Sequence, residues 1–189
     1  MMDTASDTPH GFQIKPGARP GNTAGRAPEK EGTNMNNTKY YIAYGSNMST
    51  SQMALRCPDA KLVGTGWLNG YRLAFHLHAT VERTKEAGAR VPVAVWTIEP
   101  NDERKLDRYE GVPHYYTKHT RTVEMMDGSQ IKGLIYLMKF KRDAPPVSTY
   151  VNGIVAAYRA LGFENEVEAI LMPAMQKSIE RYQQGVTIR

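Results

Sequence analysis

The carboxylate of Glu110 is the strongest candidate in this sequence for acid–base chemistry. It ends a segment predicted as a short helix, 100–111, which opens with acidic residues and closes at Gly111, a favoured left-handed cap. The helix dipole disfavours a carboxylate at this end. Partial burial there would raise its pKa toward neutrality, as a general acid or base requires. A solvated glutamate at a helix end is the alternative interpretation.

A second candidate site is the Tyr-Gly-Ser-Asn segment at 44–47. It follows the aromatic, strand-forming run 39–43 and precedes a helix-start signal at 49–52. Gly45 can adopt a positive φ, and Ser46 and Asn47 favour turns, so successive backbone N–H groups are expected to point the same way. Such a concave patch of donors suits a carboxylate, a phosphate or a developing oxyanion. An ordinary strand–loop–helix connection is the alternative.

The histidines give a weaker case for a metal site. His76 and His78 alternate along an expected strand and would share one face. Catalytic zinc normally takes three protein ligands, and no spacing selects His114, His119 or a carboxylate as the third. We therefore predict no metal.

Other nucleophile and cofactor chemistry is disfavoured. Cys57 precedes Pro58 at an expected helix end, with no base assigned to it, which argues against an activated thiol. The sequence contains no P-loop, no dinucleotide glycine fingerprint and no nucleophile elbow, so we predict no cofactor. Tyr115, Tyr116 and Tyr150 flank the proposed site region and can offer hydroxyls, although tyrosines at such positions are more often packing residues.

Composition divides the chain into two parts. Residues 1–35 are rich in Gly, Pro, Thr, Ala and Asn without apolar periodicity, and are expected to be a disordered tail or leader, with Met35 as a plausible start. Residues 36–189 are expected to be one globular domain. No apolar stretch approaches the ~20 residues of a membrane span, and a single cysteine is compatible with the cytoplasm.

The charge pattern argues against nucleic acid as a partner. The formal net charge is only +5 and the basic residues are scattered, with one tight cluster at Lys139, Lys141 and Arg142. Lysines at the end of a strand often block edge pairing, whereas nucleic-acid binding favours a longer basic stripe interleaved with aromatics.

The elements that must position Glu110 and the 44–47 turn form an α+β pattern. We expect a mixed sheet of five to six strands with helices at its ends and margins. The expected strands are 39–43, a bulged or bent pair within 61–77, the apolar run 91–98, and 115–126 and 130–140 joined at Asp127-Gly128. A charged loop is expected at 82–90. The expected helices are 49–56, 100–111, 149–161 with Ser148 as a cap, and 164–181 with a kink or break at Pro173.

Several blocks of the sequence, in this order, resemble the γ-glutamylcyclotransferase (AIG2-like) family. The resemblance covers the chain from about Tyr40 to the final helix, with departures at 93–95 and in the loop 82–86. The blocks are 44–47 after the first strand, 55–60 (Leu-Arg-Cys-Pro-Asp-Ala), 106–113 (Leu-Asp-Arg-Tyr-Glu-Gly-Val-Pro) followed by Tyr116, and 144–146 (Ala-Pro-Pro) with Tyr150.

This resemblance implies a barrel-like sheet in which the turn and Glu110 meet in one cavity. It implies an enzyme that cyclises a γ-glutamyl substrate to 5-oxoproline by an intramolecular, lyase-type acyl transfer. Glu110 would be the general acid–base; the N–H groups of Gly45, Ser46 and Asn47 would bind the substrate, and Tyr44 and Tyr116 would line the pocket.

Three alternatives remain open at the level of sequence. The substrate can be a γ-glutamyl amino acid, a γ-glutamylamine or another γ-linked amide. The same turn can serve a non-catalytic module that binds a small anion, although such a module would not need the carboxylate of Glu110. The sequence specifies neither the leaving group nor an oligomeric state.

Overall fold

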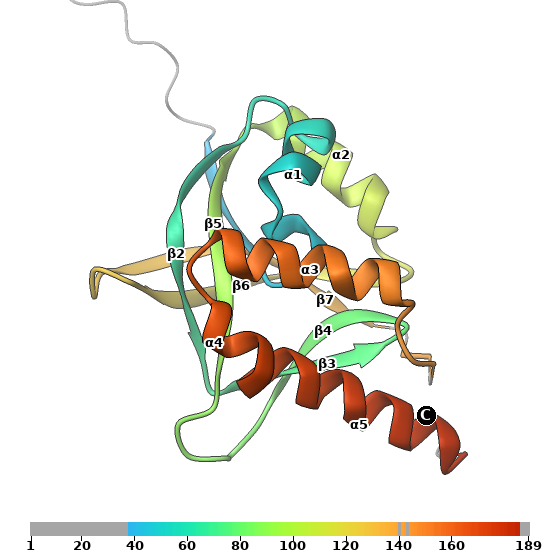
Figure 1. Ribbon diagram of the computed structural model, residues 1–189. Coiled ribbons are helices and arrows are strands. Elements are labelled where there is room, and N and C mark those ends of the chain that lie inside the picture. The colour runs from blue at the N-terminus through green and yellow to red at the C-terminus, as the bar shows by residue number, and fades with distance from the viewer. Residues whose placement is uncertain (1–37, 140, 143, 186–189) are drawn as a thin grey trace, which may run out of the picture. The chain divides into compact units, whose positions relative to one another are not determined.

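The computed structural model describes residues 38–139, 141–142 and 144–185 (Figure 1). The predicted tail at 1–35 and the final residue of the strand predicted at 130–140 lie outside these described residues. In the described part, no helix has the length and apolar character needed to cross a membrane.

A closed barrel of five strands forms the centre of the fold. Its members are β1 (Lys39–Ala43), β2 (Lys61–Asn69), β5 (Arg90–Ile98), β6 (Tyr116–Met125) and β7 (Gln130–Met138). They close in the order β1-β5-β2-β6-β7. Neighbours are antiparallel, except that β1 and β7 meet in parallel where Tyr41 pairs with Leu134. The predicted α+β class with a mixed, barrel-like sheet is therefore confirmed.

Strand β5 is the most buried strand of the barrel, as its apolar run predicts. It pairs with β1 on one side and with β2 on the other, so both of its edges are covered. The register of β2 against β5 shifts between Leu62 and Gly64, which is the bulge that the glycines of this segment indicate. Gly66 is required there because a Cβ would lie 2.3 Å from the carbonyl oxygen of Glu124 on β6.

A separate two-stranded sheet differs from the sequence prediction. Strand β3 (Tyr71–His76) pairs with β4 (His78–Arg83), and not with β2, so the pair expected within 61–77 is wrong in its partner. The loop predicted at 82–90 likewise begins too early, because Glu82 and Arg83 belong to β4. The turn escaped prediction because Leu77, a non-glycine residue, adopts a φ of 70°.

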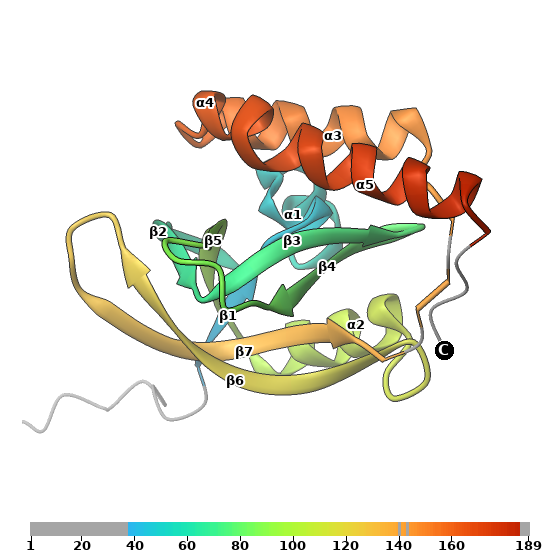
Figure 2. The ribbon, with the colours of Figure 1, turned by 90° about the horizontal axis from the view of Figure 1, so that it is seen from below.

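Helices connect and cover the strands. They are the 3₁₀ turn η2 (Ser46–Met48), α1 (Thr50–Arg56), α2 (Pro100–Glu110), α3 (Ser148–Ala160), α4 (Glu164–Glu166), the π-helical segment η3 (Val167–Leu171) and α5 (Met172–Gln183). Figure 2 shows α3 and α5 on one side of the β3–β4 hairpin, with β6, β7 and α2 on the other side. The interruption predicted at Pro173 is present as η3, which ends just before that proline.

Two of the predicted helix-end signals are present in the structure, and one is wrong. Ser49 caps α1 by accepting a hydrogen bond from the Gln52 N–H at 3.4 Å. Gly111 ends α2 in the left-handed conformation, with a φ of 63°. The cap predicted at Ser148 is wrong, because α3 begins at that residue and its cap position is Val147, which offers no side-chain bond.

Candidate active site

The 44–47 turn leaves the end of β1 and enters η2. The N–H groups of Met48 and Ser49 close this 3₁₀ turn onto the carbonyls of Gly45 and Ser46 at 2.9 and 3.1 Å. The N–H groups of Gly45, Ser46 and Asn47 come before the first of these bonds, where the start of a helix leaves donors for a ligand. That these three N–H groups bind a ligand stays a prediction.

Glycine at position 45 avoids a tight contact rather than providing the predicted backbone conformation. The residue has a φ of −122°, so the expected left-handed conformation is wrong. A Cβ here would instead lie 3.3 Å from the Ala79 Cβ and 3.4 Å from the Tyr150 hydroxyl. Both neighbours line the same cavity, so the absence of a side chain keeps space open beside the turn.

Glu110 reaches this turn from the last residue of α2. Its Oε1 accepts a hydrogen bond from Asn47 Nδ2 at 3.0 Å. Burial raises the pKa of Glu110 to about 7, while the Arg56 guanidinium and the bond from Asn47 act in the lowering direction. A carboxyl with this pKa exchanges protons readily near neutral pH.

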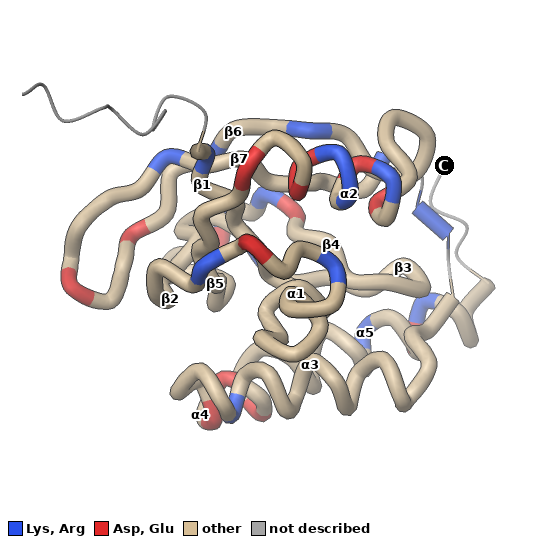
Figure 3. Tube along the Cα trace, turned by 90° about the horizontal axis from the view of Figure 1, so that it is seen from above, with Lys and Arg blue, Asp and Glu red and all other residues tan. Residues whose placement is uncertain are grey.

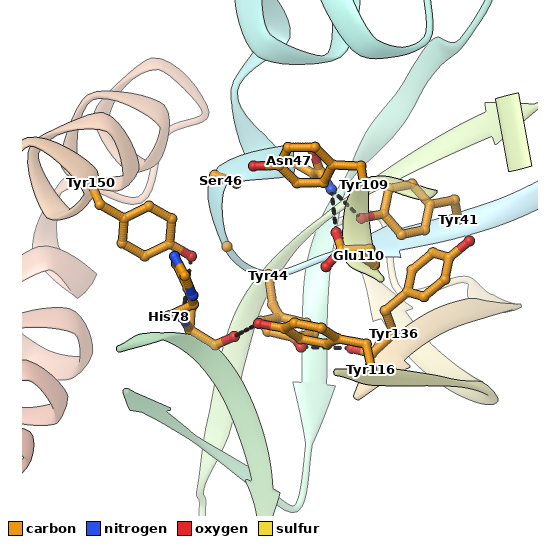
Figure 4. A pocket seen from close by; sticks show the side chains of 12 residues that line it. Tyr41, Tyr44, Ser46, Asn47, His78, Tyr109, Glu110, Tyr116, Tyr136 and Tyr150 are labelled. Atoms are coloured by element: carbon orange, nitrogen blue, oxygen red, sulfur yellow. Dashed lines mark hydrogen bonds between the residues drawn. The ribbon is translucent and has the colours of Figure 1, made fainter. Parts of the chain in front are cut away.

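A cavity of about 240 Å³ contains both features (Figure 4). The close-up shows Glu110 and Asn47 pointing toward one another, with Tyr150 and His78 across the cavity from them. All six site residues proposed from the sequence line it together. The lining residues are Tyr41, Tyr44, Gly45, Ser46, Asn47, His78, Ala79, Tyr109, Glu110, Tyr116, Tyr136 and Tyr150.

Four tyrosines of this cavity form two groups: in one group the hydroxyl donates its proton to a backbone carbonyl, and in the other the hydroxyl accepts a hydrogen bond. Tyr44 donates to the Tyr136 carbonyl at 2.6 Å, and Tyr116 donates to the Ala79 carbonyl at 3.1 Å. These two side chains, selected from the sequence, therefore hold backbone carbonyls and form walls of the cavity. Burial raises the pKa of both, so the phenols stay protonated.

Tyr41 and Tyr150 use their hydroxyls in the opposite sense. The Tyr41 hydroxyl accepts from Asn47 Nδ2 at 2.8 Å, and the Tyr150 hydroxyl accepts from the Ala79 N–H at 3.2 Å. Because each oxygen accepts from the protein, its own proton can be donated to a ligand. Burial raises the pKa of Tyr150 to about 12, which keeps that proton in place at neutral pH.

Some site residues were missed in the sequence. Tyr41 lies three residues before Tyr44, and Tyr109 directly precedes Glu110. Their closeness in sequence to candidate residues is the signal that could have identified both as lining the cavity. Arg56, at the end of α1, donates from Nη1 to Ser46 Oγ at 3.1 Å and to Asn47 Oδ1. Tyr115 is 64% exposed and does not line the cavity.

His76 and His78 lie on two strands and not on one as expected. They are register partners where β3 turns into β4, and their rings have different partners. His76 donates from Nε2 to Glu82 Oε1 at 3.2 Å, whereas the His78 ring packs edge-on against Tyr150 with centroids 5.2 Å apart. His119 bonds to Thr117 on β6. Among the described residues, no group of three or more His, Cys, Asp or Glu side chains is placed to hold a metal ion.

Neither Cys57 nor the basic cluster contributes to the cavity. Cys57 is buried, and burial raises the pKa of its thiol to about 11, which opposes thiolate formation. Lys141 forms an ion pair with Glu82. Figure 3 shows Lys and Arg positions spread along the trace, with acidic positions between them around α2.

Comparison with known proteins gives a consistent result. The family model described as Gamma-glutamyl cyclotransferase, AIG2-like matches residues 41–151. The gamma-glutamylcyclotransferase of Bos taurus is 27% identical over 139 residues, covering 68% of this chain and 74% of the relative. That of Mus musculus is 28% identical over 142 residues, covering 69% and 76%.

Solved structures resemble this one in the same way. A structure titled Gamma-glutamyl cyclotransferase superposes with a TM-score of 0.64 at 27% identity, covering 70% of this chain and 88% of that chain. An uncharacterized protein from Homo sapiens superposes with a TM-score of 0.65 at 26% identity, covering 71% and 88%.

Proposed function

The chain belongs to the gamma-glutamyl cyclotransferase, AIG2-like family, and on this premise we propose that it cyclises a γ-glutamyl amide or peptide to 5-oxoproline and releases an amine or amino acid. The names of its mammalian relatives support a cyclotransferase enzyme acting on a small γ-glutamyl substrate. The observation that carries the proposal is the 3.0 Å hydrogen bond between Asn47 and Glu110, which joins an anion-binding turn to a carboxyl of pKa about 7.

Glu110 is the proton carrier in this proposal. Its carboxylate takes a proton from the substrate α-ammonium, and the freed amine attacks the γ-carbonyl carbon to form the ring C–N bond. As the tetrahedral intermediate collapses, the bond to the leaving nitrogen breaks and the Glu110 carboxyl returns its proton to that nitrogen. The re-formed carboxylate then passes the second proton of the ring nitrogen to the departing amine, so the products are a neutral lactam and an ammonium ion. A pKa near 7 suits both halves of the exchange, because neither protonation state is scarce at neutral pH.

The 44–47 turn supplies the charge-stabilising half of the site. In this proposal the N–H groups of Gly45, Ser46 and Asn47 bind the substrate carboxylate or the oxyanion of the intermediate, and the Tyr150 hydroxyl, which lies beside Gly45, donates its proton to the same group. One such donor contributes about 2.7–4 kcal/mol to transition-state stabilisation in enzymes that use it. Tyr44 and Tyr116 line the cavity and restrict the conformation of the bound substrate.

Ring closure within one substrate molecule explains why so few groups are sufficient. Nucleophile and electrophile belong to the same γ-glutamyl group, so the protein mainly has to hold the folded-back conformer. A cavity of about 240 Å³ lined largely by packed tyrosines is suited to that restraint.

The test is a turnover assay with a matched charge control. The protein is incubated with a panel of γ-glutamyl amino acids and γ-glutamylamines, and 5-oxoproline is measured for wild type, Glu110→Gln and Glu103→Gln. Glu103 lies on the same helix but pairs with Lys39 and Lys118 outside the cavity. We expect Glu110→Gln to lose about 10²–10⁴-fold in kcat and Glu103→Gln to retain activity.

Two results would contradict the proposal. Turnover unchanged in Glu110→Gln would remove Glu110 from the mechanism. No turnover with any panel member, together with binding of 5-oxoproline or glutamate, would favour a module that only binds small anions.

A further inference from the structure

The guanidinium of Arg56 lies directly behind the proposed catalytic pair and contacts three cavity residues. Nη1 donates to Ser46 Oγ at 3.1 Å and to Asn47 Oδ1, and Nη2 donates to the Tyr109 hydroxyl at 2.6 Å. The guanidinium carbon also lies 3.8 Å from the centroid of the Tyr109 ring. This one side chain therefore links the 44–47 turn to the residue next to Glu110.

The contact with Asn47 decides which way its amide faces. A primary amide has a donor end and an acceptor end, whereas a guanidinium only donates. With Oδ1 held by Arg56, the Nδ2 end must face Glu110 Oε1 at 3.0 Å and the Tyr41 hydroxyl at 2.8 Å. The reversed amide would set its oxygen against the Glu110 carboxylate and its N–H₂ against Arg56, losing both bonds.

We propose that Arg56 is a positioning residue that fixes the Asn47 amide with its N–H₂ directed at Glu110 and so holds the carboxyl in place for proton transfer. The proposal rests on the proposed cyclotransferase function for its catalytic meaning, although the orientation of Asn47 is independent of the substrate. It also gives the Ser46 hydroxyl a role, because an oxygen that accepts from Arg56 keeps its own proton for a ligand.

The charge of Arg56 acts on the same carboxyl. Burial raises the pKa of Glu110, and Arg56 is the cation that lowers it again. The other titratable groups around this carboxyl are tyrosines on several elements and His78, whose pKa burial lowers. Those tyrosines are Tyr41, Tyr44, Tyr109, Tyr116, Tyr136 and Tyr150. Losing Arg56 is therefore expected to raise the pKa of Glu110.

Lysine cannot reproduce this arrangement. A guanidinium is planar and donates several N–H groups in fixed directions, so it can stack on Tyr109 while bonding to Ser46 and Asn47. A lysine ammonium keeps the positive charge but not the planar set of N–H donors in fixed directions. The pair of variants Arg56→Lys and Arg56→Met therefore separates charge from geometry.

The experiment uses the full chain and two kinds of measurement. Titration of the Glu110 side-chain carboxyl by ¹³C NMR reports its pKa without any substrate. Steady-state kinetics on the best panel substrate report kcat and KM for Arg56→Met, Arg56→Lys, Asn47→Ala and the Arg56→Met/Asn47→Ala double variant. Arg90→Met is the matched control, because Arg90 also stacks at 3.8 Å on an aromatic ring, that of Trp67, away from the cavity.

We expect Arg56→Met to raise the Glu110 pKa and to lower kcat about tenfold or more, by analogy with residues that orient functional groups elsewhere, with a smaller change in KM. Arg56→Lys should keep the Glu110 pKa closer to wild type yet recover only part of kcat. The double variant should lose little more than Asn47→Ala alone, since Arg56 acts through Asn47. Arg90→Met should titrate and turn over like wild type.

The proposal would be overturned by a Glu110 titration that is the same in Arg56→Met and wild type, or by losses that multiply in the double variant. Full recovery of kcat in Arg56→Lys would also contradict the proposal, because it would show that the planar guanidinium is not needed to orient Asn47. If wild type turns over no γ-glutamyl substrate, the proposed function fails and the NMR titration alone decides: a Glu110 pKa that rises in Arg56→Met and is only partly restored in Arg56→Lys supports the positioning contact, whereas no rise, or full restoration by lysine, refutes it.

Discussion

Two partly buried glutamates in this protein have opposite environments, and the difference separates the carboxyl that we propose as the proton carrier from a structural one. Glu110 faces a tyrosine-lined cavity, accepts one bond from a neutral amide, and has a pKa raised to about 7 by burial. Glu82, on β4, accepts bonds from His76, Lys141 and Arg72, and these hold its pKa well below the usual range. Burial alone therefore does not set the behaviour of a carboxyl; its partners do.

The two sites also differ in what they stabilise. The Glu82 cluster joins β3 and β4 to the segment after β7, so its ionised form supports the fold. Ionised Glu110 lacks such compensation, because the charge of Arg56 reaches it from behind Asn47 rather than through a direct bond. Ionised Glu82 thus stabilises the fold, whereas ionised Glu110 destabilises it. Such a contrast is expected where a carboxyl is kept for function at the expense of stability.

The largest expected effect is on the Glu82 side of the comparison. Glu82→Gln removes the negative charge and one of the two acceptor oxygens that serve His76, Lys141 and Arg72, and the Glu82 side chain is only 17% exposed. We expect a loss of about 2–4 kcal/mol in unfolding free energy at pH 7, reduced from the fully buried case by solvent screening. Urea unfolding measures it.

The pH dependence of this loss has a defined sign. The folded pKa of Glu82 lies below its unfolded value of about 4.5, so its stabilisation is present above pH 4.5 and is lost as the pH falls through the folded pKa. The wild-type advantage over Glu82→Gln should therefore shrink in acid. An advantage that stayed constant down to pH 3 would show that the ion pairs are not its source.

Glu110→Gln is expected to have the opposite effect on stability. The folded pKa of about 7 lies above the unfolded value of 4.5, so this group destabilises the fold progressively as the pH rises from about 4.5 to 7, and the full cost is present above pH 7. We expect the Gln variant to be more stable than wild type by about 1–3 kcal/mol at pH 8, and equally stable below about pH 4.5, where both are neutral. Thermal unfolding at the two pH values checks this. A variant that is less stable at pH 8 would contradict the stated cause of the raised pKa.

The pH dependence of catalysis should follow Glu110 and ignore Glu82. If Glu110 must be ionised to accept the ammonium proton, kcat/KM should rise with pH and level off above about 7, the pKa of this carboxyl. At pH 6 it should be about tenfold below the plateau. When kcat/KM is corrected for the fraction of folded protein, Glu82→Gln should show the same rise with pH as wild type. A shift of the apparent pKa of this profile in Glu82→Gln would mean that the two regions are electrostatically coupled.

Glu110 and the 44–47 turn could be selected from the sequence as candidates because each carries a local signal, and the structure brings both to one cavity. A strand that stops at Gly45, and a helix that ends at Gly111 just after a carboxylate, are visible in a few residues. The same local reasoning gave the Asp127-Gly128 hairpin, where Gly128 has a φ of 83°.

The Glu82 cluster and Arg56 could not be predicted in this way. Glu82 and Lys141 are 59 residues apart, and nothing near either residue indicates that they pair. The β3–β4 turn at Leu77 lacks the glycine or asparagine that usually marks such a conformation. The order in which five strands close a barrel is likewise a property of long-range packing rather than of any short segment.

The smallest expected effects distinguish the two groups of tyrosines within the cavity. Tyr150 keeps its hydroxyl proton for a ligand, whereas Tyr116 donates its proton to the Ala79 carbonyl. We expect Tyr150→Phe to lower kcat/KM about tenfold, as for the loss of one hydrogen bond to a charged or polarised group. Tyr116→Phe should lower it about twofold, with a loss of about 1 kcal/mol in stability, the typical contribution of one hydrogen bond. Kinetics and unfolding of both variants, measured in parallel, test this division, and equal losses of kcat/KM would show that hydroxyl orientation does not decide which tyrosines act on the substrate.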